Sequence, residues 1–148
     1  LLNWKYEASS LWCAKTFLYE QLKDTHGYTD FKQCYASRHD PGMRKIWHES
    51  IYAYNTPDLT RVSRGIFAEN NMYVGIRKRA ELYASLEEDV AKHVIWVDGT
   101  KRGTPVESKE SMDITVDDAT YVIDNNGTLE DLLVNVKKCI VDLDLKAL

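Results

Sequence analysis

Residues 71–81, N-M-Y-V-G-I-R-K-R-A-E, constrain the fold of this chain more than any other stretch. Residues 72–76 form a short apolar run with β-branched and aromatic side chains, which is typical of a buried strand. The run ends on the basic cluster Arg77–Arg79, and residues 80–88 then favour a helix. A strand that leads directly into a helix is half of a βαβ unit, and open α/β sheets bind ligands beyond the carboxyl ends of their strands. The basic cluster is therefore either a site for an anionic ligand or a solvated turn.

Three further short apolar runs, at residues 4–8, 93–97 and 120–123, also predict strands. Amphipathic stretches predict helices at residues 11–23, 30–37, 43–54, from Thr56-Pro57 onward, at 80–88 and after Thr128. Strands that alternate with helices predict an α/β fold, with a mainly parallel sheet and helices on both of its faces. The helix-rich residues 30–70 form an insertion between two of the strands.

The clearest helix signal follows a tight turn at residues 124–127. Thr128 and Asp131 form a near capping box, with Asp in the position that Glu usually takes. Leucines and valines at helical spacing after Thr128 give an apolar stripe, which we expect to pack on the sheet.

Residues 100–118 are polar, contain Gly103 and Pro105, and show no periodicity, so they predict a long loop. Loops of this length in compact domains are usually functional lids or disordered segments. Lys101 and Arg102 lie near the base of the loop. Because the stretch has few apolar anchors, we expect it to be mobile when no ligand is bound.

The composition bounds the class of protein. The chain has 148 residues, 28% of them charged and 44% hydrophobic, which is enough for one globular domain with a sizeable core. The net charge of −4 argues against a general nucleic-acid-coating protein. No apolar run approaches the ~20 residues that a membrane span needs. With no secretory signal pattern either, we expect a cytoplasmic protein without nucleic-acid or membrane partners.

The residues that could ligate metals show no ligand spacing. The cysteines are odd in number and far apart, at Cys13, Cys34 and Cys139, and so predict free thiols rather than disulfides or a zinc site. The histidines are equally scattered, at His26, His39, His48 and His93. We therefore expect no metal held by protein ligands alone.

In this order, the motifs resemble those of bacteriophage-type deoxynucleoside monophosphate kinases, which are P-loop kinases. The resemblance covers nearly the whole chain. Five stretches carry it: Y-E-A-S-S-L-W-C-A at 6–14, the arginine-bearing L-T-R-V-S-R-G-I-F-A-E-N at 59–70, the strand and R-x-x-x-E at 73–81, V-I-W-V at 94–97 and V-I-D-N-N-G-T-L-E-D-L at 122–132. The last is the most specific, because it resembles the family's final strand, base-side loop and final helix.

The resemblance implies one nucleotide-kinase-like domain over residues 1–148, with an acceptor-binding helical region at about 30–70 and a lid at about 100–118. It implies phosphoryl transfer from ATP, with Mg²⁺, to a deoxynucleoside monophosphate. The residues that would bind the acceptor are Arg44, Arg61, Arg64, Arg77 and Glu81. Among them, Arg61 and Arg77 would hold the acceptor nucleotide or its phosphate. Glu81 would orient Arg77 or contact the acceptor. Lys101 and Arg102 would be catalytic, with Arg102 neutralising charge in the transition state. The donor base would be flanked by Asn125, Asn126, Gly127 and Thr128.

One part of the family pattern is missing. The G-x-x-x-x-G-K-[ST] loop that cradles the donor phosphates, and the strand before it, do not occur in this sequence, which begins Leu1-Leu2 without Met. We expect that a strand, loop and helix of roughly 20–30 residues precede this segment in the parent protein, and that the segment alone is inactive. The main ATP and Mg²⁺ ligands would lie there. The family's strand order would place the missing strand between those at 72–76 and 93–97.

Two other functions stay open. The chain could be a member of the same fold that binds a nucleotide or a protein partner without catalysis, which the missing phosphate loop favours. It could also be a small-molecule kinase with another acceptor. The coding sequence upstream of Leu1 separates the kinase from the binding protein. The sequence leaves a homodimer open, and the compartment would be the host cytoplasm if a phage encodes the chain.

Overall fold

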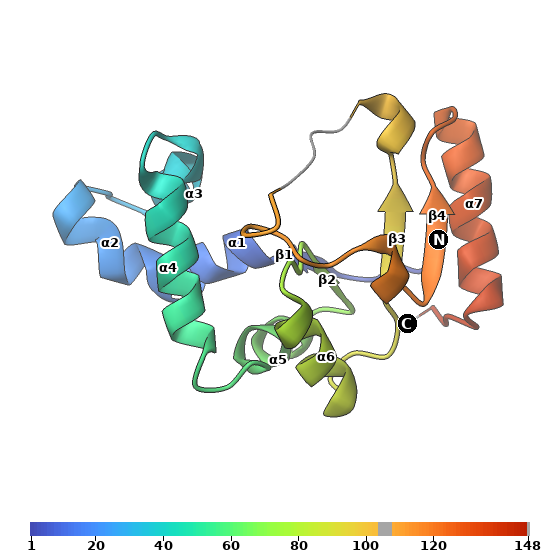
Figure 1. Ribbon diagram of the computed structural model, residues 1–148, viewed down its shortest axis with the longest axis horizontal. Helices are drawn as coiled ribbons and strands as arrows, with labels where there is room; N and C mark the ends of the chain where they lie inside the picture. The colour runs from blue at the N-terminus through green and yellow to red at the C-terminus, as the bar shows by residue number, and fades with distance from the viewer. Residues whose placement is uncertain (104–107, 148) are drawn as a thin grey trace. The chain divides into compact units, whose positions relative to one another are not determined.

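Four strands lie where the short apolar runs predict them: β1 (Tyr6–Ala8), β2 (Met72–Val74), β3 (Ile95–Asp98) and β4 (Tyr121–Asp124). They belong to a computed structural model that describes residues 1–103 and 108–147. The chain divides into an amino-terminal unit (Lys5–Ile76 with Ala80–Val90) and a carboxy-terminal unit (Leu1–Trp4, Arg77–Arg79 and Ala91–Leu148). Each unit contains one pair of parallel strands together with helices, which confirms a mixed α/β fold (Figure 1).

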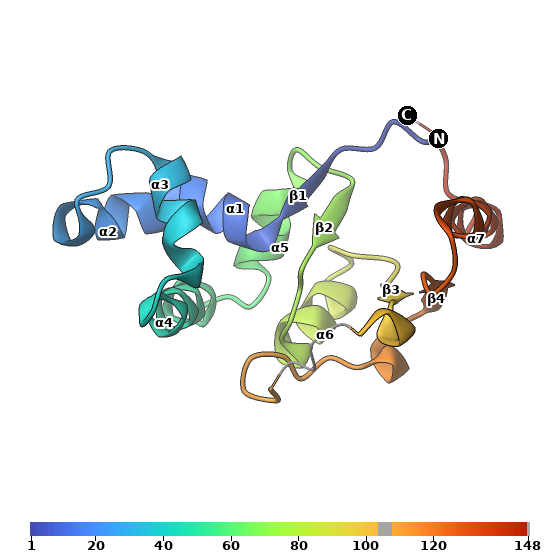
Figure 2. The ribbon, with the colours of Figure 1, turned by 90° about the horizontal axis from the view of Figure 1, so that it is seen from above.

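The amino-terminal unit is built on the parallel pair β1–β2, in which Tyr6 lies opposite Met72 and Ala8 opposite Val74 (Figure 2). The chain between these strands is helical. It contains α1 (Ser9–Cys13), a π-helical turn (Ala14–Leu18), α2 (Tyr19–His26), α3 (Phe31–Ala36), a 3₁₀ turn (Ser37–His39), α4 (Met43–Asn55) and α5 (Arg61–Phe67). After β2 comes α6 (Arg79–Glu87). The predicted helices at 11–23, 30–37, 43–54 and 80–88 are thus confirmed, and Asp30 caps α3 by accepting from the amide of Gln33.

The core of this unit is formed by residues of α1, the π-helical turn and helices α2 to α5. Leu18, Val62 and Ile66 are buried there, as the apolar stripes of their helices predict. One close approach depends on a glycine: a Cβ at Gly65 would lie 2.1 Å from Cζ2 of Trp12. Gly65 therefore lets the indole ring pack directly against the backbone of α5.

The predicted helix start at Thr56-Pro57 was wrong, because α5 begins at Arg61. Thr56 instead closes the preceding helix, with its Oγ1 donating to the carbonyl oxygen of Tyr52 at 2.5 Å. Asp58 then forms a local turn by accepting from both the amide (2.9 Å) and the hydroxyl (2.7 Å) of Thr60. These side-chain bonds compete with helix formation and delay it by one turn.

The carboxy-terminal unit is built on the parallel pair β3–β4, with α7 (Leu129–Asp142) packed against β4 (Figure 1). The capping box of α7 is confirmed: Thr128 Oγ1 accepts from the amide of Asp131, and the Asp131 carboxylate accepts from the amide of Thr128. The predicted loop at 100–118 contains two 3₁₀ turns, Thr100–Arg102 and Val116–Asp118. Its residues 104–107 lie outside the described part of the chain, and its mobility stays a prediction.

The sequence predicts one mainly parallel sheet, whereas the strands that the structure describes form two separate parallel pairs. In these pairs β2 and β3 each have one hydrogen-bonded neighbour. Among the described residues, no helix is both long enough and apolar enough to cross a membrane.

Candidate functional site

The carboxyl ends of β3 and β4 lie side by side, because the last residues of the two strands, Asp98 and Asp124, are in register. The chain leaves β3 through Gly99 into the turn Thr100–Arg102, and it leaves β4 through residues 125–128 into α7. The amide of Asn125 donates to the carbonyl oxygen of Asp98 at 2.8 Å, which joins the two exits. We call this group, Asp98, Thr100–Arg102 and residues 124–128, the strand-end site. It occupies the edge at which open parallel sheets usually bind ligands.

Arg102 lies across the loop that follows β4. Its Nε donates to the carbonyl oxygen of Asn125 at 2.5 Å, and its Nη2 donates to the carbonyl oxygen of Gly127 at 2.6 Å. The amide of the preceding residue, Lys101, donates to Oδ1 of Asn126 at 2.8 Å. The structure thus brings together Lys101 and Arg102, for which the resemblance implies catalysis, and the loop for which it implies donor-base binding.

The side chain of Asn126 braces the loop against both strands. Its Nδ2 donates to the carbonyl oxygen of Asp98 at 3.1 Å and to Oδ1 of Asp124 at 2.7 Å. The amide of Thr100 donates to Asp98 at 3.0 Å, and this bond, with smaller contributions from the Thr100 and Asn126 side chains, lowers the pKa of Asp98. The carboxylate of Asp98 therefore stays ionised and acts as an acceptor that fixes the turn.

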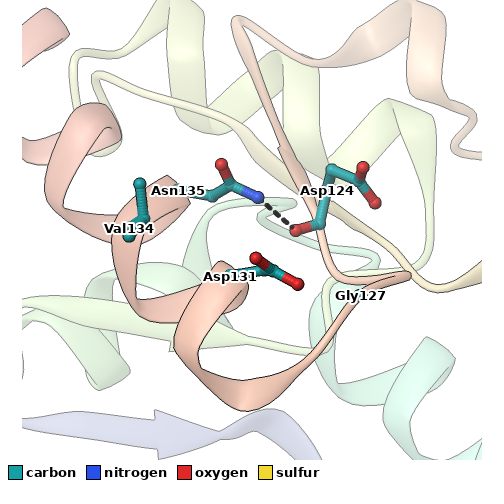
Figure 3. Close-up of a pocket in the computed structure, with 5 residues that line it drawn as sticks. All are labelled: Asp124, Gly127, Asp131, Val134 and Asn135. Carbon is teal, nitrogen blue, oxygen red and sulfur yellow. Dashed lines mark hydrogen bonds between the residues drawn. The ribbon is translucent and has the colours of Figure 1, made fainter.

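A hollow of about 300 Å³ lies between the loop and the start of α7. It is lined by Asp124, Gly127, Asp131, Val134 and Asn135 (Figure 3). Figure 3 shows Asp131 and Asn135 extending from α7 toward the end of β4, where Nδ2 of Asn135 donates to the carbonyl oxygen of Asp124 at 2.9 Å. The surface of the hollow is rich in oxygen acceptors and so suits a ligand that carries N–H donors.

Gly127 makes room for the carboxylate beside it. A Cβ at this position would lie 2.5 Å from Oδ2 of Asp131. The same Oδ2 accepts from the amide of Thr128 at 2.8 Å and from its hydroxyl at 2.9 Å, and these bonds lower the pKa of Asp131. A side chain at residue 127 would therefore disturb both the loop and the helix cap.

Sequence reasoning missed five residues of this region: Asp98, Asp124, Asp131 as a lining residue, Val134 and Asn135. A signal for two of them was present, since Asp98 and Asp124 each directly follow a predicted strand. Asp124 was interpreted only as part of the tight turn at 124–127, and Asp98 was given no role. Because parallel strands end at one edge, their positions also predict that they meet.

The basic cluster Arg77–Arg79 is bound to acidic and carbonyl groups of the carboxy-terminal unit. Arg79 holds Asp118 with two bonds of 3.0 Å, from Nε to Oδ1 and from Nη2 to Oδ2. Lys78 donates to the carbonyl oxygen of Glu110, and the carbonyl oxygen of Arg77 accepts from an amide at 3.1 Å, that of Asp113. The side chains of Lys78 and Arg79 therefore already bind groups of the protein.

The predicted acceptor-binding arginines on the helices of the amino-terminal unit also have protein partners. Arg61 stacks on the ring of Tyr54, with Cζ 3.7 Å from the ring centroid, and donates to the carbonyl oxygen of the same residue at 3.2 Å. Arg64 donates from Nε to the hydroxyl of Thr60 at 2.8 Å and forms an ion pair with Glu88. Arg44 is exposed on α4. A phosphate that binds Arg64 would have to displace Thr60 and Glu88 from its guanidinium group.

Glu81 lies in a partly buried cluster of the same unit. The hydroxyl of Tyr73 donates to Oε1 of Glu81 at 3.1 Å. Burial raises the pKa of Glu81, and burial together with the Glu81 charge raises the pKa of Tyr73 well above its ordinary value. The buried thiol of Cys13 has its pKa raised to about 12, mainly by burial and secondarily by Glu81. The structure therefore gives Glu81 a neutral phenol as its hydrogen-bonding partner.

In residues 1–103 and 108–147, no three His, Cys, Asp or Glu side chains gather closely enough to hold a metal ion.

Scans of the chain against protein-family models, curated proteins and solved structures found no match in any of the three.

Proposed function

We propose that this chain carries the nucleotide-binding part of a nucleoside monophosphate kinase, which transfers a phosphoryl group from ATP to a deoxynucleoside monophosphate. The observation that carries the proposal is the contact of Arg102 with the carbonyl oxygens of Asn125 and Gly127. It joins a cation from the turn after β3 to the loop after β4, at the ligand-binding edge of a parallel strand pair. The resemblance implies catalytic and base-binding roles for these same residues.

The strand pairing supports the finer proposal of a P-loop-kinase fold, with one sheet covered on both faces. Both pairs are parallel, and in the part of the chain described β2 and β3 each have one neighbouring strand. In the family's strand order, the first strand pairs with the strands that correspond to β2 and β3. A central parallel strand leaves unpaired backbone groups on its neighbours when it is absent.

The proposed chemistry depends on position and charge. Phosphoryl transfer needs little covalent help from protein, and most of the stabilisation comes from cations around the transferring group. Arg102 and Lys101 would supply that charge on the donor side. By the resemblance, Arg61 and Arg77 would hold the acceptor nucleotide or its phosphate, which arginine grips with paired hydrogen bonds. The donor phosphates and Mg²⁺ need a phosphate-binding loop, so the proposal concerns a protein in which this segment is joined to one.

The test has two parts. The first is turnover of ATP with each deoxynucleoside monophosphate, measured as ADP release by the longest protein that the coding region encodes. The second is a titration of the 148-residue chain with ATP, followed by backbone amide signals. We expect turnover with at least one monophosphate, and ATP-dependent shifts at Arg102 and residues 125–128. A protein that contains the phosphate loop but neither turns over nor shows those shifts would rule the proposal out.

A non-catalytic nucleotide-binding or protein-binding role is the second candidate. The ion pair of Arg64 with Glu88 favours it, because that cation is already neutralised by the protein. In that case ATP or a partner would bind without ADP release even when the phosphate loop is present. A kinase of the same fold with another small-molecule acceptor would instead release ADP only with that acceptor.

A further inference from the structure

Two backbone carbonyls of the strand-end site converge on one guanidinium group. Arg102 uses Nε and Nη2, two nitrogens on the same carbon, to reach the carbonyl oxygens of Asn125 and Gly127 at 2.5 and 2.6 Å. The N–H bonds of this fork are nearly parallel, because the guanidinium group is planar. We call the two oxygens the two-carbonyl cradle. Its spacing matches a planar ligand with two adjacent N–H donors.

The cradle is held by contacts that do not involve the Arg102 side chain. Asn125 donates its amide to Asp98 at 2.8 Å, and Asn126 bonds to both strand ends. The amide of Thr128 donates to Asp131 at 2.8 Å on the far side of Gly127. The two acceptors are therefore held in place before any ligand arrives, and such preorganisation lowers the cost of binding.

Arg102 is suited to leave the cradle. Its side chain is exposed, so water can replace these carbonyls as the partners of its N–H groups. The next residue is Gly103, with a φ of +71°, at which the backbone leaves the turn. A ligand with the same fork can therefore compete with this side chain for the two oxygens.

We propose that the two-carbonyl cradle binds the guanine base of a nucleotide, and that Arg102 occupies the cradle when no nucleotide is bound. Guanine carries N1–H and N2–H on one ring carbon, C2, just as arginine carries Nε–H and Nη2–H on Cζ. Adenine offers a single amino group beside N1, and that bare nitrogen would face a carbonyl oxygen. The inference rests on the proposed nucleotide-binding role of the loop. It names guanine rather than adenine as the base that the loop favours, so GTP would bind there more tightly than the ATP of the proposed reaction.

Three monophosphates with the same sugar and charge separate the bases: GMP with two donors on one edge, IMP with N1–H alone, and AMP without N1–H. We expect the affinity of the chain to fall about tenfold from GMP to IMP, for the one lost bond, equivalent to about 1.4 kcal/mol. It should fall further for AMP, because the bare N1 of adenine would face a carbonyl oxygen. Affinities come from titrations followed by the amide signals of residues 125–128. An equal or higher affinity for AMP would overturn the guanine assignment, while ADP release in the turnover assay would still test the kinase proposal separately.

Variants of Arg102 test the competition. Arg102→Lys keeps the charge but cannot form the fork, and Arg102→Ala frees both carbonyls. We expect each variant to bind GMP about tenfold more tightly than the unaltered chain does, whereas Lys92→Ala, which removes a charge at the other end of β3, should not change the affinity. GMP affinity that is unchanged or weaker in both Arg102 variants would overturn the proposal.

A separate measurement shows whether the loop at residues 125–128 keeps its structure in the Arg102 variants. Protection of the Lys101 amide from hydrogen exchange reports its bond to Asn126. If Arg102→Ala loses this protection, Arg102→Lys alone decides the test. Loss of protection in both variants would show that the cradle depends on Arg102, which would also overturn the proposal.

Discussion

Arg79 and Asp118 form a two-pronged ion pair that links the start of α6 to the end of the polar stretch 100–118. The pair is asymmetric, because 45% of the Arg79 side chain but only 6% of the Asp118 side chain is exposed. Asp118 also accepts from the amide of Thr115 at 2.8 Å, which shapes the 3₁₀ turn there. The carboxylate side chain is thus largely shielded from water, whereas the guanidinium that holds it is exposed.

This asymmetry predicts the outcome of Arg79→Ala. The change removes two charge-assisted hydrogen bonds from a poorly solvated carboxylate, so we expect a loss of about 1–2 kcal/mol in the free energy of unfolding, after allowance for the exposure of the arginine. Chemical denaturation measures this loss. The matched control is Lys138→Ala, because Lys138 pairs with Asp142 on the exposed surface of α7 and such pairs contribute little to stability. Equal losses in the two variants would contradict the role of burial.

Gly65→Ala should destabilise the amino-terminal unit. Alanine in a helix normally adds roughly 0.5–1 kcal/mol of stability relative to glycine. Here the new Cβ would lie 2.1 Å from the indole of Trp12, so we expect a net loss of about 1–3 kcal/mol instead. Thermal or denaturant unfolding gives the value. In a Trp12→Leu background the same change should cost much less, and an equal cost there would show that the indole is not the cause.

Glu81 predicts a pH dependence of stability. Because burial raises its pKa in the folded chain, the folded state holds this proton more tightly than the unfolded state does. The stability from the neutral carboxyl is complete below the ordinary pKa of 4.5 and is lost as the pH rises through the raised value. Glu81→Gln should remove this loss, so the variant should gain relative stability toward neutral pH. Denaturation between acidic and neutral pH checks this, with the exposed Glu87→Gln on the same helix as the control; parallel curves for all three proteins would contradict it.

Arg77→Ala tests the acceptor site in a protein that includes the phosphate loop. If Arg77 grips the acceptor phosphate, its loss removes a charge-assisted contact of about 1.5–3 kcal/mol and lowers turnover roughly ten- to hundredfold. ATP affinity should stay nearly unchanged, because the donor phosphates belong to the phosphate loop. Steady-state kinetics and a separate ATP titration give both numbers, with Lys92→Ala as the charge control. Unaltered turnover would show that Arg77 is a solvated turn residue.

Local patterns predicted much of the fold. The four strands follow from short apolar runs, and the cap of α7 follows from the spacing of Thr128 and Asp131, because both signals act within a few residues. The start of α5 was wrong because Asp58 and Thr56 bond to the backbone nearby, and several outcomes of such competition fit one sequence. The pairing of strands into two ladders depends on contacts between residues far apart in the chain, which periodicity does not specify.

The strand-end site was only half predictable. The sequence places Lys101, Arg102 and the loop at 125–128 after two strands, and the edge at which parallel strands end brings them near each other. It does not predict that Arg102 points at the carbonyls of Asn125 and Gly127, since this depends on the backbone direction of both turns. The hollow beside Asp131 was missed for a related reason: its lining residues come from the end of β4, the loop and two turns of α7.

The two strand pairs close very different lengths of chain. In β1–β2 the partners are 66 residues apart, whereas hydrogen bonds between the chain segments that carry β3 and β4 join residues only 26 apart. Closing the longer segment costs more chain entropy, and parallel pairing across long separations forms slowly. The helices between β1 and β2 have to pack first, because their packing brings the ends of that segment together. In refolding followed by pulsed hydrogen exchange, the amides of β2 should therefore gain protection later than those of α4 and later than those of β4.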